Sequence, residues 1–252
     1  MLYNERAEVI LRQVQLQATV KIPELAELLH VSVDTVRRDL KSMEQEGCIK
    51  CVRGGACLPD SISARSDFMG REIIHSELKR EAAKKALREI EPGALIALNS
   101  GTTNTILAQE LAAWNGKCTV VTNNYAAIPI LMQNPEITLI AIGGQVDRME
   151  KSTFGSQCEA EFARYYPDIA FLSVNAVNYK DGFTDFRMGE LGVLRLLAQH
   201  SGKVIAVMDS SKLGTRSKVQ VFPVEQADKL ISDHTVPEQL KQQYLEKGLV
   251  IE

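Results

Sequence analysis

The stretch Ile22–Ala56, IPELAELLHVSVDTVRRDLKSMEQEGCIKCVRGGA, combines two apolar repeats at helical spacing with a glycine-rich end. In the first repeat, Leu25, Leu28 and Leu29 recur at the spacing of one helix face. They follow Pro23, whose fixed φ angle suits a first helical turn. The spacing therefore predicts a short helix, and the second repeat begins only a few residues later.

Ser32 marks the start of a second predicted helix, because its hydroxyl can accept a hydrogen bond from a free backbone N–H. Within that helix Val36, Leu40 and Met43 fall on one face, while polar and charged residues fall on the others. The second helix therefore has one side to bury and one side to offer to a partner.

A basic hairpin is predicted after Gly47, where CIKCVRGGA forms two short strands around a glycine turn with Arg53 near its tip. Gly54 and Gly55 allow positive φ or close backbone approach. Two helices, a tight turn and a basic hairpin make up a winged helix-turn-helix, so double-stranded DNA is the first partner to consider. The alternative is a helical subdomain with a solvated basic face.

The second helix would be the recognition helix, which reads base edges mainly from its N-terminal residues. Sequence readout is accordingly expected from Ser32, Asp34, Thr35 and Arg38. Phosphate contact or close approach to the DNA backbone is expected from Arg37, Lys41, Lys50, Arg53 and Gly54.

The composition does not fit a general nucleic-acid coat protein. At 252 residues and 45% hydrophobic, the chain can bury one sizeable core plus a small domain, and its net charge is −3. Binding to DNA must then depend on a local basic surface. No apolar run approaches the roughly 20 residues of a membrane span. The start, MLYNERAEVILRQVQ, is interpreted as a charged amphipathic helix, so we expect a cytoplasmic protein with no membrane partner.

Five cysteines without an export signal predict reduced thiols. The spacing Cys48-x-x-Cys51, with Cys57 nearby, raises the question of a zinc or redox site. A structural zinc site needs four ligands, and the nearest histidines, His30 and His75, show no regular spacing. We therefore predict ordinary thiols, no metal and no cofactor.

The domain boundaries follow from changes in periodicity. Residues 1–57 are predicted to form the winged helix-turn-helix and residues 77–252 an α/β domain for effector binding and oligomerisation. Between them, residues 58–76 are polar, contain Pro59 and Gly70, and are predicted to be a linker.

Short apolar segments alternate with helical stretches in the second domain. The predicted strands are ALIALN, CTVVTN, ITLIAIGG, IAFLSVN, KVIAVMD and KLIS. This alternation predicts a Rossmann-like, mostly parallel sheet with helices on both faces. Ligands of such sheets bind at the carboxyl ends of the strands.

The loop Ser100–Asn104, SGTTN, leads directly into a predicted helix and can surround a phosphate with N–H groups and hydroxyls. Lys212 adds a positive charge at another strand end. Together they indicate a phosphorylated small molecule, although Ser and Thr also occur as caps that bind nothing. The candidate effector residues are Ser100, Gly101, Thr102, Thr103, Asn104, Asn123, Gly143, Gly144, Asn175, Asp209 and Lys212.

The whole chain resembles the DeoR family of bacterial transcriptional regulators. VSVDTVRRDLKSMEQEGCIKCVRGGA is similar to its N-terminal motif, and SGTT, TNN, IGG, DIAFLS, GFTD, DSSKLG and a late SD resemble its effector domain in order and spacing. The resemblance implies an effector domain similar in fold to ribose-5-phosphate isomerase, and a sugar phosphate or related metabolite as ligand. The chain departs from the family at Asn99, where many members have an acid, and at Ala176-Val177-Asn178, where many have Gly-Ile-Asp. Both changes make the expected pocket less anionic.

The sequence thus predicts a transcriptional regulator, a repressor of a carbohydrate-utilisation operon, whose operator binding is controlled by a phosphorylated sugar. Symmetric operator binding implies a homo-oligomer, either a dimer or a tetramer. The alternative is a sugar-phosphate isomerase with a fused accessory domain, for which Glu190 and Asp209 are possible bases. We do not predict an enzyme, because Glu190 in RMGELGVLRLL is more simply interpreted as a helical surface residue.

Overall fold

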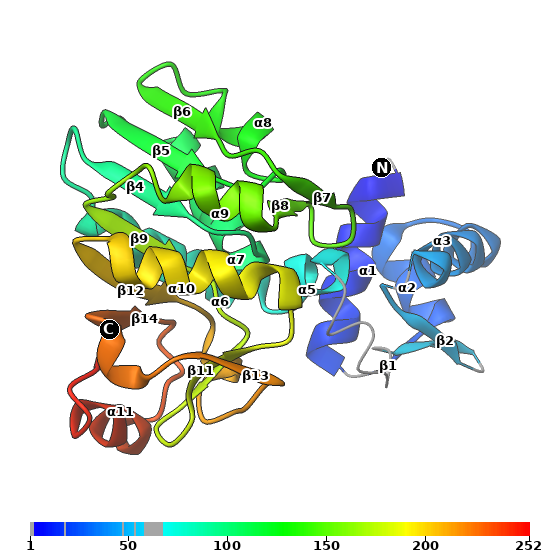
Figure 1. Ribbon diagram of the computed structural model, residues 1–252. Helices are drawn as coiled ribbons and strands as arrows, with labels where there is room; N and C mark the ends of the chain where they lie inside the picture. Colours follow the sequence, from blue (N-terminus) through cyan, green and yellow to red (C-terminus); the bar gives the residue numbers. More distant parts are fainter. Residues whose placement is uncertain (1–2, 18, 47, 53, 58–67) are drawn as a thin grey trace. The chain divides into compact units, whose positions relative to one another are not determined.

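The computed structural model describes residues 3–17, 19–46, 48–52, 54–57 and 68–252 (Figure 1). The chain divides into two compact units, Met1–Ile74 and His75–Glu252. None of the described helices has the length and apolar character needed to span a bilayer.

The first unit is a helical bundle with a small antiparallel sheet. Its elements are α1 (Tyr3–Gln17), β1 (Thr19–Lys21), α2 (Ile22–Leu29), α3 (Val33–Gln45), β2 (Lys50–Val52), β3 (Gly55–Cys57) and α5 (Phe68–Ile73). The strand order is β1-β3-β2, so β1 adds a third strand to the predicted hairpin. The winged helix-turn-helix is confirmed, with a sheet one strand larger than expected.

The turn between α2 and α3 forms as predicted. His30 ends α2 in the left-handed conformation (φ +53°), and Ser32 caps α3 by accepting a hydrogen bond from the Thr35 N–H at 3.1 Å. The apolar face of α3 is buried through Val36, Leu40 and Met43 in one cluster with α1 and α2. This packing fixes which side of α3 faces solvent.

The second unit is built on a seven-stranded sheet flanked by helices. Its strands are β4 (Leu95–Leu98), β5 (Cys118–Thr122), β6 (Ile137–Ala141), β9 (Ile169–Leu172), β12 (Lys203–Val207), β14 (Lys229–Ile231) and β15 (Val250–Ile251). Every pairing is parallel, in the order β15-β14-β12-β9-β4-β5-β6. The six predicted strands are confirmed, and β15 is an addition.

Alternate residues of the strands enter two separate cores. Ala97 of β4 packs in the core that contains α9 (Ser156–Phe162), α10 (Leu191–His200) and α11 (Glu238–Leu245). Its neighbours Ile96 and Leu98 pack in the core that contains α6 (Ser76–Ala86), α7 (Thr102–Ala112) and α8 (Ile128–Leu131). Helices therefore cover both faces of the sheet, as predicted.

Two smaller sheets were not expected from the sequence. β7 (Gln145–Asp147) and β8 (Ser152–Phe154) form a hairpin, and β10 (Ala176–Asn178), β11 (Gly182–Asp185) and β13 (Val219–Phe222) form an antiparallel sheet in the order β10-β11-β13. β7 and β8 follow the carboxyl end of the edge strand β6, and β10 and β11 follow that of the central strand β9. Both smaller sheets therefore place additional side chains beyond that edge of the main sheet.

The predicted linker is partly structured. Within residues 58–76 the chain forms α5, and α6 starts at Ser76, the last residue of the predicted linker. Residues 58–67 lie outside the described residues. The remaining elements are the 3-10 turns η1 (Leu87–Glu89), η2 (Met188–Glu190), η3 (Ser210–Lys212) and η4 (Val224–Gln226).

Tyr244 connects α11 to the antiparallel sheet. Its buried hydroxyl donates to the Val177 carbonyl at 2.8 Å and accepts from the Gly214 N–H at 3.2 Å. We expect Tyr244→Phe to lower the free energy of unfolding by about 1 to 3 kcal/mol in chemical denaturation, because two buried backbone groups lose their partner. The control is Tyr179→Phe, since Tyr179 is 53% exposed. Equal stability of the two variants would contradict the assignment.

Candidate DNA-binding surface and effector site

The solvent face of α3 carries the predicted DNA-binding side chains. Asp34, Arg37, Arg38 and Lys41 are exposed, and Thr35 is partly exposed. Arg37 pairs with Asp34 at 3.0 Å within the helix. Exposed pairs of this kind contribute little to stability, so Arg37 can exchange Asp34 for a phosphate at low cost.

The predicted readout residues Ser32 and Thr35 also contact each other. Their hydroxyl oxygens lie 2.9 Å apart, and the Ser32 oxygen accepts the Thr35 N–H. Ser32 therefore has a structural role as the cap of α3, while both residues lie at the end of the helix expected to approach bases.

The two glycines of the wing, Gly54 and Gly55, have different structural roles. Gly54 has a φ of +84°, is exposed, and has no atom within 4 Å of the position that a Cβ would occupy. A Cβ on Gly55 would lie 1.9 Å from the Val20 carbonyl oxygen, so Gly55 serves close packing of β3 on β1. Lys50 is exposed at the start of β2, and Arg53 lies outside the described residues.

A buried ion pair that the sequence did not reveal holds α3 on α1. Arg6 donates from Nε and Nη2 to the two carboxylate oxygens of Asp39, at 2.7 and 3.0 Å. Side-chain exposures are 14% and 7%. Asp39 belongs to the RRDL stretch, and its position on the buried face of α3 is the signal that distinguishes it from its exposed neighbours.

In the second unit, the SGTT loop lies between β4 and α7. Gly101 has a φ of +132°, and a Cβ there would lie 2.6 Å from Ser173 Oγ, so the loop needs glycine at this position. Among the residues that the structure describes, the hydroxyls of Thr102 and Thr103 have no hydrogen-bond partner. They lie in the first turn of α7, where backbone N–H groups also lack helical partners.

The sheet reverses its order at β4. β5 and β6 extend the sheet on one side of β4, and β9, β12, β14 and β15 extend it on the other. Ligands of open α/β sheets bind at such a point, outside the carboxyl ends of the strands. The SGTT loop follows β4, so it lies at the position where this rule expects a ligand.

Asn104 and Asn99 connect the two strands at the reversal. The Asn104 amide donates to the carbonyls of Asn99 and Phe171, at 3.0 and 2.8 Å. The Asn99 amide donates to the Ser100 and Ser173 carbonyls and accepts from the Ser173 N–H. Both side chains are fully buried and bonded to the ends of β4 and β9.

Arg187 crosses the same point and was not predicted. Its guanidinium makes five hydrogen bonds, to both carboxylate oxygens of Asp185, to the Ser100 carbonyl and hydroxyl, and to the Ser173 carbonyl, over distances of 2.6 to 3.3 Å. The side chain is 5% exposed. Arg187 therefore ties the SGTT loop and the end of β9 to the antiparallel sheet.

Asp185 and Arg187 keep each other charged. Burial alone would raise the pKa of Asp185, but the adjacent Arg187 guanidinium and the N–H groups of Arg187 and Asn175 hold that pKa below its usual value. Burial would lower the pKa of Arg187, and the Asp185 carboxylate raises it instead. The pair is thus an ionised bridge inside the protein.

Glu190 corrects the sequence interpretation, since it is not a surface residue. It is 2% exposed, and its carboxylate accepts from Ser152 Oγ at 2.7 Å and from Asn123 Nδ2 at 3.2 Å. Burial raises its pKa, although the nearby Arg187 charge and the hydrogen bonds oppose the shift. The helix predicted by the periodicity of GELGVLRLL is present as α10, but Glu190 lies in the turn η2 that precedes it.

The other predicted effector residues are spread along the carboxyl edge. Gly143 is exposed, and Gly144 packs so closely on α9 that a Cβ would lie 2.8 Å from that of Cys158. The Asn175 N–H donates to Asp185. Asp209 is buried and caps η3 through the Ser211 N–H, and Lys212 is half-buried in η3. The structure thus brings Ser100 and Asn123 together around Glu190, while Asp209 and Lys212 lie at the end of β12.

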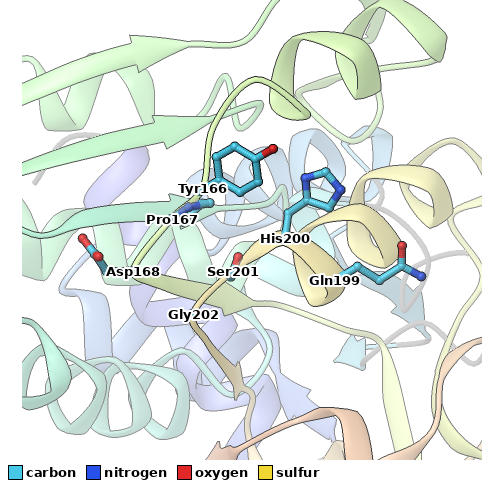
Figure 2. A pocket seen from close by; sticks show the side chains of 7 residues that line it. All are labelled: Tyr166, Pro167, Asp168, Gln199, His200, Ser201 and Gly202. Carbon is cyan, nitrogen blue, oxygen red and sulfur yellow. The ribbon is translucent and has the colours of Figure 1, made fainter.

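One open hollow lies away from this edge. It measures about 530 Å³ and is lined by residues that precede β9 and β12, at the amino ends of the strands (Figure 2). Tyr166 and His200 stack there with ring centroids 5.7 Å apart. A ligand at the predicted edge therefore cannot occupy this hollow.

The five cysteines form no disulfide bond. All five are free thiols, and the Sγ atoms of Cys51 and Cys57 lie 3.7 Å from backbone carbonyls. In the described part of the chain, no group of three or more potential ligand side chains is placed to hold a metal ion.

Family models match both units. A DeoR-like helix-turn-helix domain matches residues 6–62, and a DeoR C-terminal sensor domain matches residues 74–234. The chain belongs to the DeoR family of transcriptional regulators. As a member of the DeoR family, it is a DNA-binding regulator.

Named DeoR-type relatives are similar over almost their whole length. The chain is 31% identical to the transcriptional regulator GolR of Listeria innocua, covering 98% of this chain and 97% of that protein. It is 30% identical to the transcriptional repressor GlcR of Bacillus subtilis (92% and 89%) and 29% identical to a putative aga operon repressor of Escherichia coli (93% and 87%). Ribose 5-phosphate isomerase A of Methanocaldococcus jannaschii is 19% identical over 55% of this chain and 54% of that chain, with a TM-score of 0.41.

The buried bridge gives a prediction about stability. We expect Asp185→Asn to lower the free energy of unfolding by about 3 to 5 kcal/mol at neutral pH, because Arg187 is left buried without its counter-ion. The folded pKa of Asp185 lies below the unfolded value of about 3.9, so this contribution is full above that pH and is lost as the pH falls through the folded pKa.

Chemical denaturation at several pH values measures the effect. The matched control is Asp181→Asn, which removes a less buried carboxylate from the same antiparallel hairpin, 3.8 Å from Arg216. A difference between wild type and Asp185→Asn that stays constant down to strongly acidic pH would contradict the bridge.

Proposed function

We propose that this DeoR-family regulator represses a carbohydrate-utilisation operon and that a phosphorylated sugar controls its binding to the operator. One observation carries the proposal: an exposed basic recognition helix and a phosphate-type loop with free hydroxyls occur in separate units of one chain. The relatives named as repressors in Bacillus subtilis and Escherichia coli support the direction of control.

The charge on α3 supports operator binding. Among the exposed residues of α3, three cations, Arg37, Arg38 and Lys41, stand against two acids, Asp34 and Glu44. The third acid of the helix, Asp39, is already paired with Arg6. The face is therefore locally basic despite the net charge of −3, as binding to phosphates requires.

The SGTT loop supports a phosphate ligand. The hydroxyls of Thr102 and Thr103 have no partner among the described residues, and they occur at the N-terminus of the 11-residue helix α7. Such a helix end offers N–H donors and a favourable dipole to an anion. We therefore propose that this loop binds the phosphate of the effector. The other candidate effector residues would then bind the rest of the effector.

Control of the operator requires that the effector distinguish two arrangements. A ligand with equal affinity for the DNA-competent and DNA-incompetent forms shifts no population. Operator half-sites lie about 34 Å apart, one helical turn, so we propose a homo-oligomer, a dimer or a tetramer, that presents two recognition helices.

Isomerase activity is not part of the proposal. Its two candidate bases are both buried, Glu190 at 2% exposure and Asp209 at 0%, and Asp209 is used to cap η3. We expect no interconversion when the protein is incubated with aldose and ketose phosphates and followed by NMR. Product formation at the rate of an enzyme would make catalysis the primary function.

The direct test of regulation is an electrophoretic shift of the intergenic DNA upstream of the gene, titrated with a panel of sugar phosphates. We expect salt-sensitive binding that one phosphorylated compound releases and its unphosphorylated sugar does not. Binding that ignores every phosphorylated compound would contradict the proposed sensor, and absence of a specific shift would contradict the proposed operator.

A second test addresses readout by α3. We expect Arg38→Ala to weaken specific operator binding by about 1 to 3 kcal/mol, the value of a good bidentate base contact, and to leave effector affinity unchanged. The control is Arg164→Ala, which removes an exposed arginine from the other unit. Equal loss on operator and on random DNA would assign Arg38 to phosphate contact instead.

A further inference from the structure

The side-chain oxygen of Asn123 is a buried acceptor to which no described residue donates a hydrogen bond. Its Nδ2 donates to the Thr153 carbonyl at 2.7 Å, and because a carbonyl can only accept, this contact fixes which end of the amide is nitrogen. The other end, Oδ1, is buried and has no partner among the described residues. Buried polar atoms are normally paired, so an unpaired acceptor calls for a donor from outside the protein.

Glu190 adds a second acceptor beside it. Its carboxylate receives Ser152 Oγ and Asn123 Nδ2, while two carboxylate oxygens can accept about four hydrogen bonds. The Ser100 hydroxyl is also a hydrogen-bond partner of Glu190. The cluster of Asn123, Ser152 and Glu190, here called the acceptor cluster, is thus continuous with the start of the SGTT loop.

The chemistry of the acceptor cluster selects its ligand. Asn123 Oδ1 is always a hydrogen-bond acceptor, and the Glu190 carboxylate is purely an acceptor when it is ionised. Both groups therefore match hydroxyl groups of a ligand. A phosphate offers acceptors and negative charge, which match the Thr102 and Thr103 hydroxyls and the start of α7 instead. One ligand could therefore place its hydroxyl groups at the acceptor cluster and its phosphate at the SGTT loop.

We propose that the acceptor cluster binds hydroxyl groups of the effector, while the SGTT loop binds its phosphate. The inference rests on the proposed function and narrows it, because the effector must then be a polyhydroxylated phosphate ester. Against an ionised Glu190, a phosphorylated carboxylic acid would place a second anion, so we expect it to bind more weakly than a sugar phosphate.

Burial of the cluster links binding to conformation. Ser100, Asn123 and Glu190 are at most 2% exposed, so a ligand reaches them only if the residues that cover them move. Arg187 lies three residues before Glu190 and holds Ser100 and Ser173, so movement around Glu190 would also act on the SGTT loop. The effector thereby stabilises an arrangement different from the closed one, which is the differential affinity that control requires.

Calorimetry on the full chain tests the proposal with two probes, inorganic phosphate and the sugar phosphate that wild type binds most tightly from a panel of pentose and hexose phosphates. We expect Glu190→Gln to weaken sugar-phosphate binding about tenfold or more and inorganic phosphate less than twofold. Ser152→Ala should act in the same direction. The control is Glu161→Gln, which removes a carboxylate paired only with exposed Arg164 on the surface.

A deoxy analogue separates contact from a merely structural role. If Glu190 accepts a hydroxyl of the sugar, the analogue that lacks this hydroxyl binds wild type and Glu190→Gln with equal affinity. Where Glu190→Gln fails to fold, Ser152→Ala with the same probes decides.

Each remaining outcome has a distinct meaning. Variants that weaken sugar phosphate and inorganic phosphate equally, or neither, overturn the acceptor cluster and leave the proposed function standing. Wild type that binds no sugar phosphate overturns the proposed function, and the inference with it.

Discussion

The second unit depends on the hydrogen bonds and the counter-ion of one buried guanidinium, that of Arg187. Arg187 reaches the ends of β4 and β9 where the sheet reverses, and its five hydrogen bonds join the SGTT loop, Ser173 and Asp185. A buried charge is tolerated only when it is paired and fully bonded. The antiparallel sheet that carries Asp185 is therefore a structural requirement of the site, because without it Arg187 has no counter-ion.

This bridge also determines the electrostatics of its surroundings. Asp185 neutralises Arg187, so Glu190 remains as the acid whose partners at the site are neutral hydroxyl and amide groups. A hydroxyl-bearing part of the effector is compatible with such an environment, whereas a second anionic group beside an ionised Glu190 is not. The departure from the family pattern at Asn99 has a similar effect, because an amide there bonds β4 to β9 without adding charge.

The sequence predicted what local periodicity encodes. The α2–α3 pair, the Ser32 cap and six parallel strands follow from apolar spacing and turn residues within a few positions. β8, β10 and β11 are three or four residues long and carry no such period, so they were not foreseen. Their absence from the prediction hid Ser152 and Asp185, and with them the reason for burying Arg187.

Misplacing Glu190 had a different cause. Its segment has the helical period expected for a surface helix, but the residue occupies the turn before α10, at the end of the helix that faces the strand ends. Asp39 in the first unit is also a buried acid for which the sequence made no prediction, and its place on the buried face of α3 determines its burial. The periodicity of a sequence predicts a helix, but the elements packed around that helix determine which of its residues are buried.

The claim that the effector site lies at the carboxyl ends of β4 and β9 is tested most directly by amide hydrogen exchange with and without a sugar phosphate that releases the operator. The account predicts altered exchange in the SGTT loop and in the segment from Asp185 to Glu190. Changes confined to the hollow lined by Tyr166 and His200, with the carboxyl edge unaffected, would contradict it.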